Sequence, residues 1–187
     1  MGFKLMAQIM QEDVAWAEES IFRIESLIAG QAFPPPIFLS TYRWGRFLTD
    51  IHLLKEAPGP QHEAKVRDYR SNAYQSGKAA LKNSRKFVPY RTKILCLMGT
   101  YYWLIGKQGK AMKWWDRAIK EGERLGARPD LSRTYFEVGK RLLEPESKYK
   151  ELNGIEAKGY LEKARIMFEE MGLERDLDEL DKITSDS

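Results

Sequence analysis

The sequence predicts an all-α fold, and three observations support this prediction. Apolar residues recur three or four positions apart along almost the whole chain of 187 residues. No stretch alternates apolar and polar residues in the way that a half-buried strand does. Breaks rich in Gly and Pro are few and well separated, and the segments between them are long enough for amphipathic helices.

The breaks divide the chain into a series of helices. The first break is the segment 30–36 (GQAFPPP), and the second is 57–61 (APGPQ). Later breaks fall at 88–89 (VP), 106–109 (GKQG), 126–129 (GARP), 145–154 and 172. We therefore expect main helices at 3–29, 36–55, 63–86, 90–105, 109–125, 131–144 and 154–171, and a short helix at 177–183.

Two of these helices share one order of small and large apolar residues. Positions 46 residues apart match: Ala111 with Ala157, Ala118 with Ala164, Gly126 with Gly172, and Asp130 with Asp176. An Ala lets a neighbouring helix approach, and a large residue one turn later fills the remaining groove. Each Gly is expected to end its helix in the left-handed conformation, and each Asp to cap the helix that follows.

The helices that precede them contain a recurring glycine. Gly45, Gly99 and Gly139 each follow a large apolar residue and stand three positions before another one. A glycine inside a helix costs about 1 kcal/mol relative to Ala. Its recurrence at one helical position predicts a close approach of a neighbouring helix there.

These positions resemble the tetratricopeptide repeat (TPR), in which two helices form each repeat. The segment 92–123 fits best, with Met98, Gly99, Tyr102, Ala111, Trp115 and Ala118 at the spacings of the family. The segment 132–168 has the same pattern with a longer loop, in Val138, Gly139, Leu142, Ala157, Leu161 and Ala164. A weaker match covers Trp44, Gly45, Leu48, Ala73, Gly77 and Ala80, with an insertion around Pro58 and Pro60.

The resemblance implies an antiparallel helix-pair solenoid of about three repeats. The chain would form one array, 1–187, with a leading helix at 1–30, repeats at 36–88, 90–126 and 131–172, and a cap and tail at 176–187. The array looks similar to the C-terminal helical arrays of large bacterial signalling proteins that carry a cyclase or kinase domain and an ATPase module. By this likeness the chain is part of a longer protein.

The residue counts argue against several classes of protein. The single Cys96 excludes an internal disulfide and a multi-cysteine zinc site, and His52 and His62 lie ten residues apart, too far for a helical metal pair. No phosphate-binding loop, dinucleotide-binding motif or zinc-protease motif occurs. We therefore predict that the chain is not an enzyme and needs no cofactor and no metal.

If the resemblance holds, the first helix of each pair lines a concave face that binds another protein or a neighbouring domain. The register of the glycines places the partner-binding groove at Tyr42, Arg46, Lys93, Trp103, Arg133, Phe136 and Lys140. Cations between aromatic side chains suit an acidic peptide or a C-terminal carboxylate. The predicted function is non-enzymatic protein–protein interaction, as a regulatory or scaffolding segment of a larger signalling protein. Trp114, outside the core positions, is a second candidate contact.

The alternative function is nucleic-acid binding. The stretch 78–93, from Lys78 to Lys93, combines six cations with Phe87 and Tyr90, a composition that can bind phosphates and stack bases. The net charge of the whole chain is only +4, which disfavours this alternative. No apolar run is long enough to span a bilayer and no signal peptide is visible, so we expect a cytoplasmic protein without membrane contact. The oligomeric state stays open.

Overall fold

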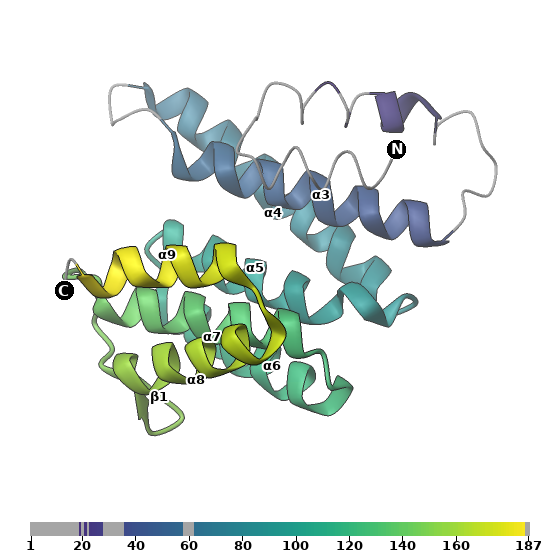
Figure 1. Ribbon diagram of the computed structural model, residues 1–187. Coiled ribbons are helices and arrows are strands. Elements are labelled where there is room, and N and C mark those ends of the chain that lie inside the picture. The colour runs from purple at the N-terminus through teal and green to yellow at the C-terminus, as the bar shows by residue number, and fades with distance from the viewer. Residues whose placement is uncertain (1–18, 20, 22, 28–35, 58–61, 186–187) are drawn as a thin grey trace. The chain divides into compact units, whose positions relative to one another are not determined.

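The computed structural model describes residues 19, 21, 23–27, 36–57 and 62–185, and they are mostly helical (Figure 1). This confirms the all-α class. The helices are α3 (Pro36–Lys55), α4 (Glu63–Ser84), α5 (Arg91–Leu104), α6 (Gln108–Leu125), α7 (Arg128–Leu143), α8 (Ala157–Met171) and α9 (Glu174–Ser185), with a 3-10 turn, η2 (Val88–Tyr90), before α5.

The expected helix boundaries agree with these to within three residues from position 36 onward. Most of the expected leading helix, 3–29, lies outside the described residues, and the described positions 19, 21 and 23–27 are helical. None of the helices in the described part of the chain is both long and apolar enough to cross a membrane. The chain divides into two compact units, Met1–Leu97 and Met98–Ser187, and the division falls within α5.

In the first unit, α3 packs along α4 because each helix has one apolar face. Phe47 of α3 and the small residues Ala73 and Ala80 of α4 are fully buried. Ile21, from the leading segment, is also buried and packs with Ile24 and Tyr42. The core of this unit therefore combines the leading segment with α3 and α4.

In the second unit, α7 contacts both α6 and α8, and α9 packs mainly on α8. Trp115, Tyr160 and Phe168 are the largest side chains in its core, and all three are fully buried. Aromatic side chains bury more area than others, which makes them strong contributors to a small core. Leu180 is the buried residue of α9, and its side chain, only 1% exposed, packs into this core.

Two of the three recurring glycines, Gly99 and Gly139, lie at close helix contacts, as the sequence predicts. A Cβ atom added to Gly99 would lie 2.2 Å from Nε1 of Trp115, and one added to Gly139 would lie 2.7 Å from Cγ of Leu161. Trp115 and Leu161 are the residues that match at the 46-residue offset. The same packing contact thus occurs twice, between α5 and α6 and between α7 and α8. The four matched alanines, Ala111, Ala118, Ala157 and Ala164, are all buried.

The helix caps confirm one prediction and correct another. Gly126 and Gly172 end α6 and α8 with φ values of 60° and 63°, the left-handed conformation that glycine adopts easily. The expectation that Asp130 and Asp176 cap the following helices is wrong. Both helices begin earlier, so each Asp lies in the first turn. In α7 the earlier start follows from Pro129, because proline is favoured in the first helical turn.

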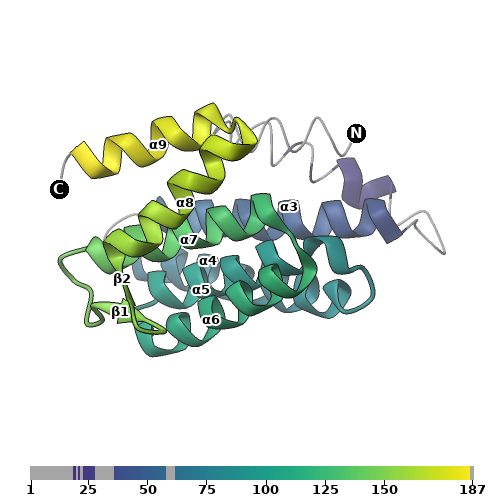
Figure 2. The ribbon, with the colours of Figure 1, turned by 60° about the horizontal axis from the view of Figure 1, so that its bottom comes forward.

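A short β-hairpin between α7 and α8 is a further element, which the helical pattern of the sequence did not predict. It pairs β1 (Glu151–Leu152) with β2 (Ile155–Glu156), and Figure 2 shows it beside the start of α8. Asn153 and Gly154 form its turn with φ values of 53° and 72°. Both values are positive, which a two-residue turn of type I′ requires. The dipeptide Asn-Gly is a strong hairpin signal that could have been recognised in the sequence.

Candidate functional site

The predicted groove residues of the first unit are held by neighbouring side chains. The hydroxyl of Tyr42 donates a hydrogen bond to Glu25. Burial, followed by this hydrogen bond and the charge of Glu25, raises the pKa of Tyr42 far above its ordinary value. The Nε atom of Arg46 lies 3.2 Å from Oδ2 of the buried Asp50. Its Nη1 atom lies 3.6 Å from Oε1 of Glu25. Lys93 lies over aromatic rings, with Nζ 5.0 Å from the centre of the Trp44 ring.

Two predicted groove residues of the second unit also have partners within that unit. Trp103 is only 7% exposed, and its indole N–H donates to the Glu144 carboxylate at 2.6 Å. Arg133 donates two parallel hydrogen bonds of 2.8 Å to Asp176 at the start of α9. Paired bonds of this kind are among the stronger charge-assisted contacts. A ligand that used these two side chains would have to replace Glu144 and Asp176.

The other two groove residues of this unit are half-buried. Phe136 packs edge to face on Phe168, with ring centres 6.1 Å apart. Lys140 lies one helical turn further along α7 and is partly exposed. The two side chains thus combine a partly accessible ring with a cation on one helix.

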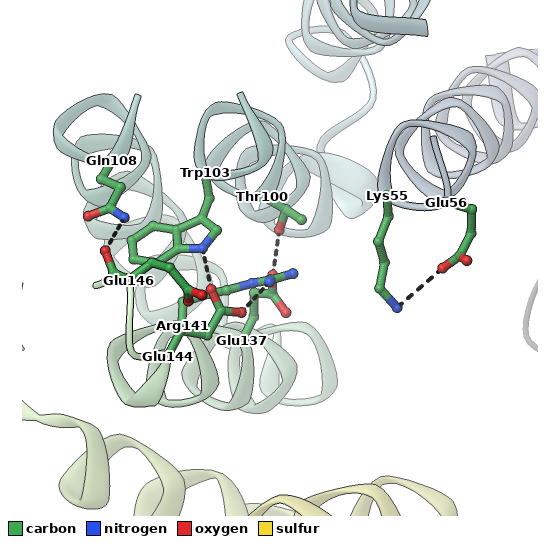
Figure 3. Close-up of polar contacts among 9 residues, drawn as sticks. All are labelled: Lys55, Glu56, Thr100, Trp103, Gln108, Glu137, Arg141, Glu144 and Glu146. Atoms are coloured by element: carbon green, nitrogen blue, oxygen red, sulfur yellow. Dashed lines mark hydrogen bonds and ion pairs between the residues drawn. The ribbon is translucent and has the colours of Figure 1, made fainter. Parts of the chain in front are cut away.

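The best-formed polar cluster of the second unit joins α5 to α7 (Figure 3). Its centre is Arg141, which is 8% exposed and donates to Glu137 at 2.9 Å and to Glu144 at 2.5 Å. The Thr100 hydroxyl donates to Glu137 at 2.9 Å, and Trp103 donates to Glu144. Residues 137 and 141 are four positions apart on one face of α7, and Glu144 directly follows the last residue of this helix. The cluster holds two carboxylates and one guanidinium in a closed set of hydrogen bonds.

The electrostatics of this cluster favour the ionised carboxylate. Burial alone would raise the pKa of Glu137, but the charge and hydrogen bonds of Arg141 outweigh it and lower the pKa below its ordinary value. A carboxyl group with a lowered pKa is a poor general acid near neutral pH. The cluster is therefore suited to joining two helices rather than to proton transfer.

The outer side of α6 carries a patch that the groove prediction did not include. The ring of Trp114 stacks on Tyr102 of α5, with 9° between the planes and 6.4 Å between centres. The guanidinium carbon of Arg117 lies 4.5 Å from the centre of the Trp114 ring. The Nζ atom of Lys110 lies 5.5 Å from the centre of the Tyr102 ring. We call Tyr102, Lys110, Trp114 and Arg117 the α6 patch. The spacing of Lys110, Trp114 and Arg117 by four and three was the sequence signal for it.

The basic stretch 78–93 is divided between two environments. Lys78, Lys82, Arg85 and Lys86 are exposed at the end of α4, whereas Arg91 and Lys93 are half-buried at the start of α5. Tyr90 is half-buried too, and its hydroxyl lies 2.8 Å from that of Thr41. The exposed cations thus belong to α4 and to the two residues that follow it, Arg85 and Lys86.

The carboxylates do not assemble a metal site in the described part of the chain. Within residues 19, 21, 23–27, 36–57 and 62–185, no group of three His, Cys, Asp or Glu side chains is arranged to hold an ion. In comparisons with protein-family models, curated proteins and solved structures, nothing matches the chain. Its function is therefore inferred from the geometry of its surfaces.

Proposed function

We propose that the chain is a non-enzymatic protein-interaction module built from TPR-like helix hairpins. The observation that supports this proposal is the repeated contact in which Gly99 meets Trp115 and Gly139 meets Leu161. Hairpins that stack only on their neighbours present long helical surfaces, and proteins of this kind use such surfaces to bind partners. In this proposal the module is a regulatory or scaffolding segment of a larger signalling protein.

We assign the first contact with the partner to the α6 patch. Arg117 and Lys110 lie over aromatic rings, which restricts their motion and reduces the entropy lost when a ligand is bound. The flat guanidinium over Trp114 can still offer its N–H groups to a carboxylate. Trp and Arg are also the residues that most often dominate binding energy at interfaces. The partner that fits this chemistry is an acidic segment of another protein or of a neighbouring domain.

The predicted groove is the second surface of this proposal. Within the second unit, Lys140 and Phe136 offer a cation and a ring without displacement of the contacts of Trp103 and Arg133. A carboxylate of an acidic peptide would bind the ammonium group of Lys140. The two surfaces can be told apart because Arg117 and Lys140 lie on different helices, α6 and α7.

The experiment measures binding of a fluorescent peptide rich in Glu and Asp, compared with a Gln and Asn peptide of the same length. We expect Arg117→Glu to weaken binding of the acidic peptide about tenfold, because an attraction becomes a repulsion. Lys140→Glu tests the groove in the same way. Lys158→Glu, an equal charge change at an exposed site on α8, is the control and should have little effect. Equal binding of the two peptides would refute the proposal.

A further inference from the structure

The exposed side of α4 carries a row of cations. Arg67, Lys78, Lys82 and Arg85 are exposed and lie at helical spacing with Ser71 and Tyr74. Arg85 follows the last residue of α4 and keeps helical dihedral angles, with φ −69° and ψ −29°. The opposite side of the helix is buried, at Ala73, Gly77, Ala80 and Ser84. We call the four cations Arg67, Lys78, Lys82 and Arg85 the α4 row.

Among the described residues, no carboxylate neutralises the α4 row. Within the described part of the chain, none of its four cations forms an ion pair, whereas cations of the second unit such as Lys120, Arg124 and Arg128 pair with carboxylates. The segment 65–93 contains nine Lys and Arg against a single Asp, a net charge of +8 in a chain whose total is +4. Positive charge is therefore concentrated on and around this helix.

We propose that the α4 row binds the phosphate backbone of double-stranded nucleic acid. From Arg67 to Arg85 the row rises by 18 residue steps, about 27 Å of helix axis. This length equals about eight base pairs at 3.4 Å each. A duplex backbone supplies regularly spaced anions over such a length. Binding releases the counterions that surround the phosphates, and this makes the interaction favourable without contacts to the bases. The inferred activity is independent of base sequence and goes beyond protein interaction.

A duplex fits this surface better than a single strand does. Proteins that bind single strands stack the bases on accessible aromatic rings. Each of the two tyrosines of α4 already has a lysine over its ring. The Nζ atom of Lys65 lies 5.7 Å from the centre of the Tyr69 ring, and the Nζ atom of Lys78 lies 5.3 Å from the centre of the Tyr74 ring.

A membrane surface fits less well for a different reason. A helix that lies in a lipid surface needs an exposed apolar side. Between Arg67 and Lys82, none of the exposed positions of α4 is aliphatic, and the aliphatic residues there are buried or half-buried.

The test measures the affinity of the full chain for labelled DNA and RNA duplexes of 20 base pairs by fluorescence anisotropy. Four phosphate contacts predict a slope of about −3.6 for log K against log salt concentration. The affinity should therefore fall about 150-fold between 50 and 200 mM salt. The triple variant Lys78→Ala, Lys82→Ala, Arg85→Ala should bind at least tenfold more weakly at 50 mM salt, with a slope of about −0.9.

The matched control removes the same number of charges from the second unit, in Lys120→Ala, Arg124→Ala, Arg175→Ala. This variant should bind like the wild type, and circular dichroism should show that both triple variants are folded. Asp68→Asn, which removes the acidic residue of the segment, should strengthen binding. The proposal is overturned if neither duplex binds at 50 mM salt, or if the control variant loses as much affinity as the α4 variant. It is also overturned if phosphatidylserine vesicles or the acidic peptide bind at this row more tightly than either duplex.

Discussion

Single residues determine how closely the helices of the second unit approach one another. At Gly99 and Gly139 the partner side chain occupies the space that a Cβ atom would need. The partners, Trp115 and Leu161, are buried, so a shift of either side chain would displace other atoms of the core. Because protein cores are packed at crystal-like density, such positions tolerate little added volume. The two glycines are therefore required by packing, and their helical φ values alone would not require them.

We predict that Gly99→Ala destabilises the protein by about 1–3 kcal/mol, since overpacking outweighs the gain in helix propensity. Gly109→Ala in α6 is the matched control, because its added Cβ would meet only the hydroxyl end of Tyr149, at 2.9 Å, and this exposed side chain can rotate away. The control should be neutral or stabilising. Urea denaturation of the two variants measures the difference. Equal stability of both variants would show that Trp115 can shift and that the contact is not tight.

We predict that removal of Arg141 from the buried polar cluster lowers the stability of the folded protein. In Arg141→Met, Glu137 and Glu144 would lose the guanidinium that pairs with both, and breaking a buried ion pair costs about 3–5 kcal/mol. Arg124→Ala is the control, because its ion pair with Glu121 lies on the surface. That variant should leave the Tm almost unchanged. If Arg141→Met melts at the temperature of the wild type, the cluster is well hydrated.

The same cluster predicts how stability depends on pH. The pKa of Glu137 is lowered in the folded state, so the unfolded chain binds the proton more tightly. The ionised Glu137 contributes fully to the free energy of unfolding above the pKa of an unfolded Glu, about 4.3. This contribution is lost as the pH falls through the lower pKa of the folded state. Glu137→Gln should therefore reduce the loss of stability below about pH 4.5. Parallel curves of Tm against pH for the variant and the wild type would contradict this assignment.

At the level of elements, the two hairpins of the second unit share their packing but differ in the connecting loop. From Gly99 to Trp115 is 16 positions, and from Gly139 to Leu161 is 22. The additional residues include the β-hairpin. Asn153 in its turn donates to Asp116 of α6 at 2.9 Å, and Tyr160 donates to the Leu152 carbonyl. The insertion is thus anchored to the unit on both sides and does not disturb the repeated helix contact.

We predict that Ala118→Leu overpacks α6 and costs about 1–3 kcal/mol. Ala118 is fully buried at a position that matches Ala164 in α8. The control is Ala64→Leu, since Ala64 is exposed in the first turn of α4 and a larger side chain there meets solvent. Thermal denaturation distinguishes the two variants. An unchanged Tm for Ala118→Leu would mean that the assumed repeat register is wrong.

At the level of the whole molecule, charge is divided unevenly between the two units. Met1–Leu97 contains 14 basic and 9 acidic residues, a net charge of +5, whereas Met98–Ser187 has a net charge of −1. A modest total charge therefore conceals a basic region, and for this reason the overall balance is a poor guide to nucleic-acid binding. The proposed peptide contact on α6 and the inferred duplex contact on α4 lie in different units and can be tested independently.

The array proposal predicts that a defect at one end of the second unit stays local. In a stack of repeats each element depends mainly on its neighbours. Leu180→Ala should leave a cavity under α9 and destabilise that end by about 2–5 kcal/mol. In a hydrogen-exchange experiment, the backbone amides of α9 and α8 should then lose much more protection than the amides around Gly99 in α5. Asp178→Ala, at an exposed position of α9, is the control. A uniform loss of protection would indicate a single cooperative bundle.

The helices, their ends at Gly126 and Gly172, and the positions of small residues at helix contacts could all be predicted from the order of the amino acids. These features follow from local rules, because helix periodicity and caps depend on residues a few positions apart. Which side chains meet across helices became known only from the three-dimensional structure. Arg133 pairs with Asp176, 43 residues away, and Trp103 bonds to Glu144, 41 residues away, and the groove prediction included neither contact. Such pairs depend on which helix faces are brought together, and no local pattern encodes that choice.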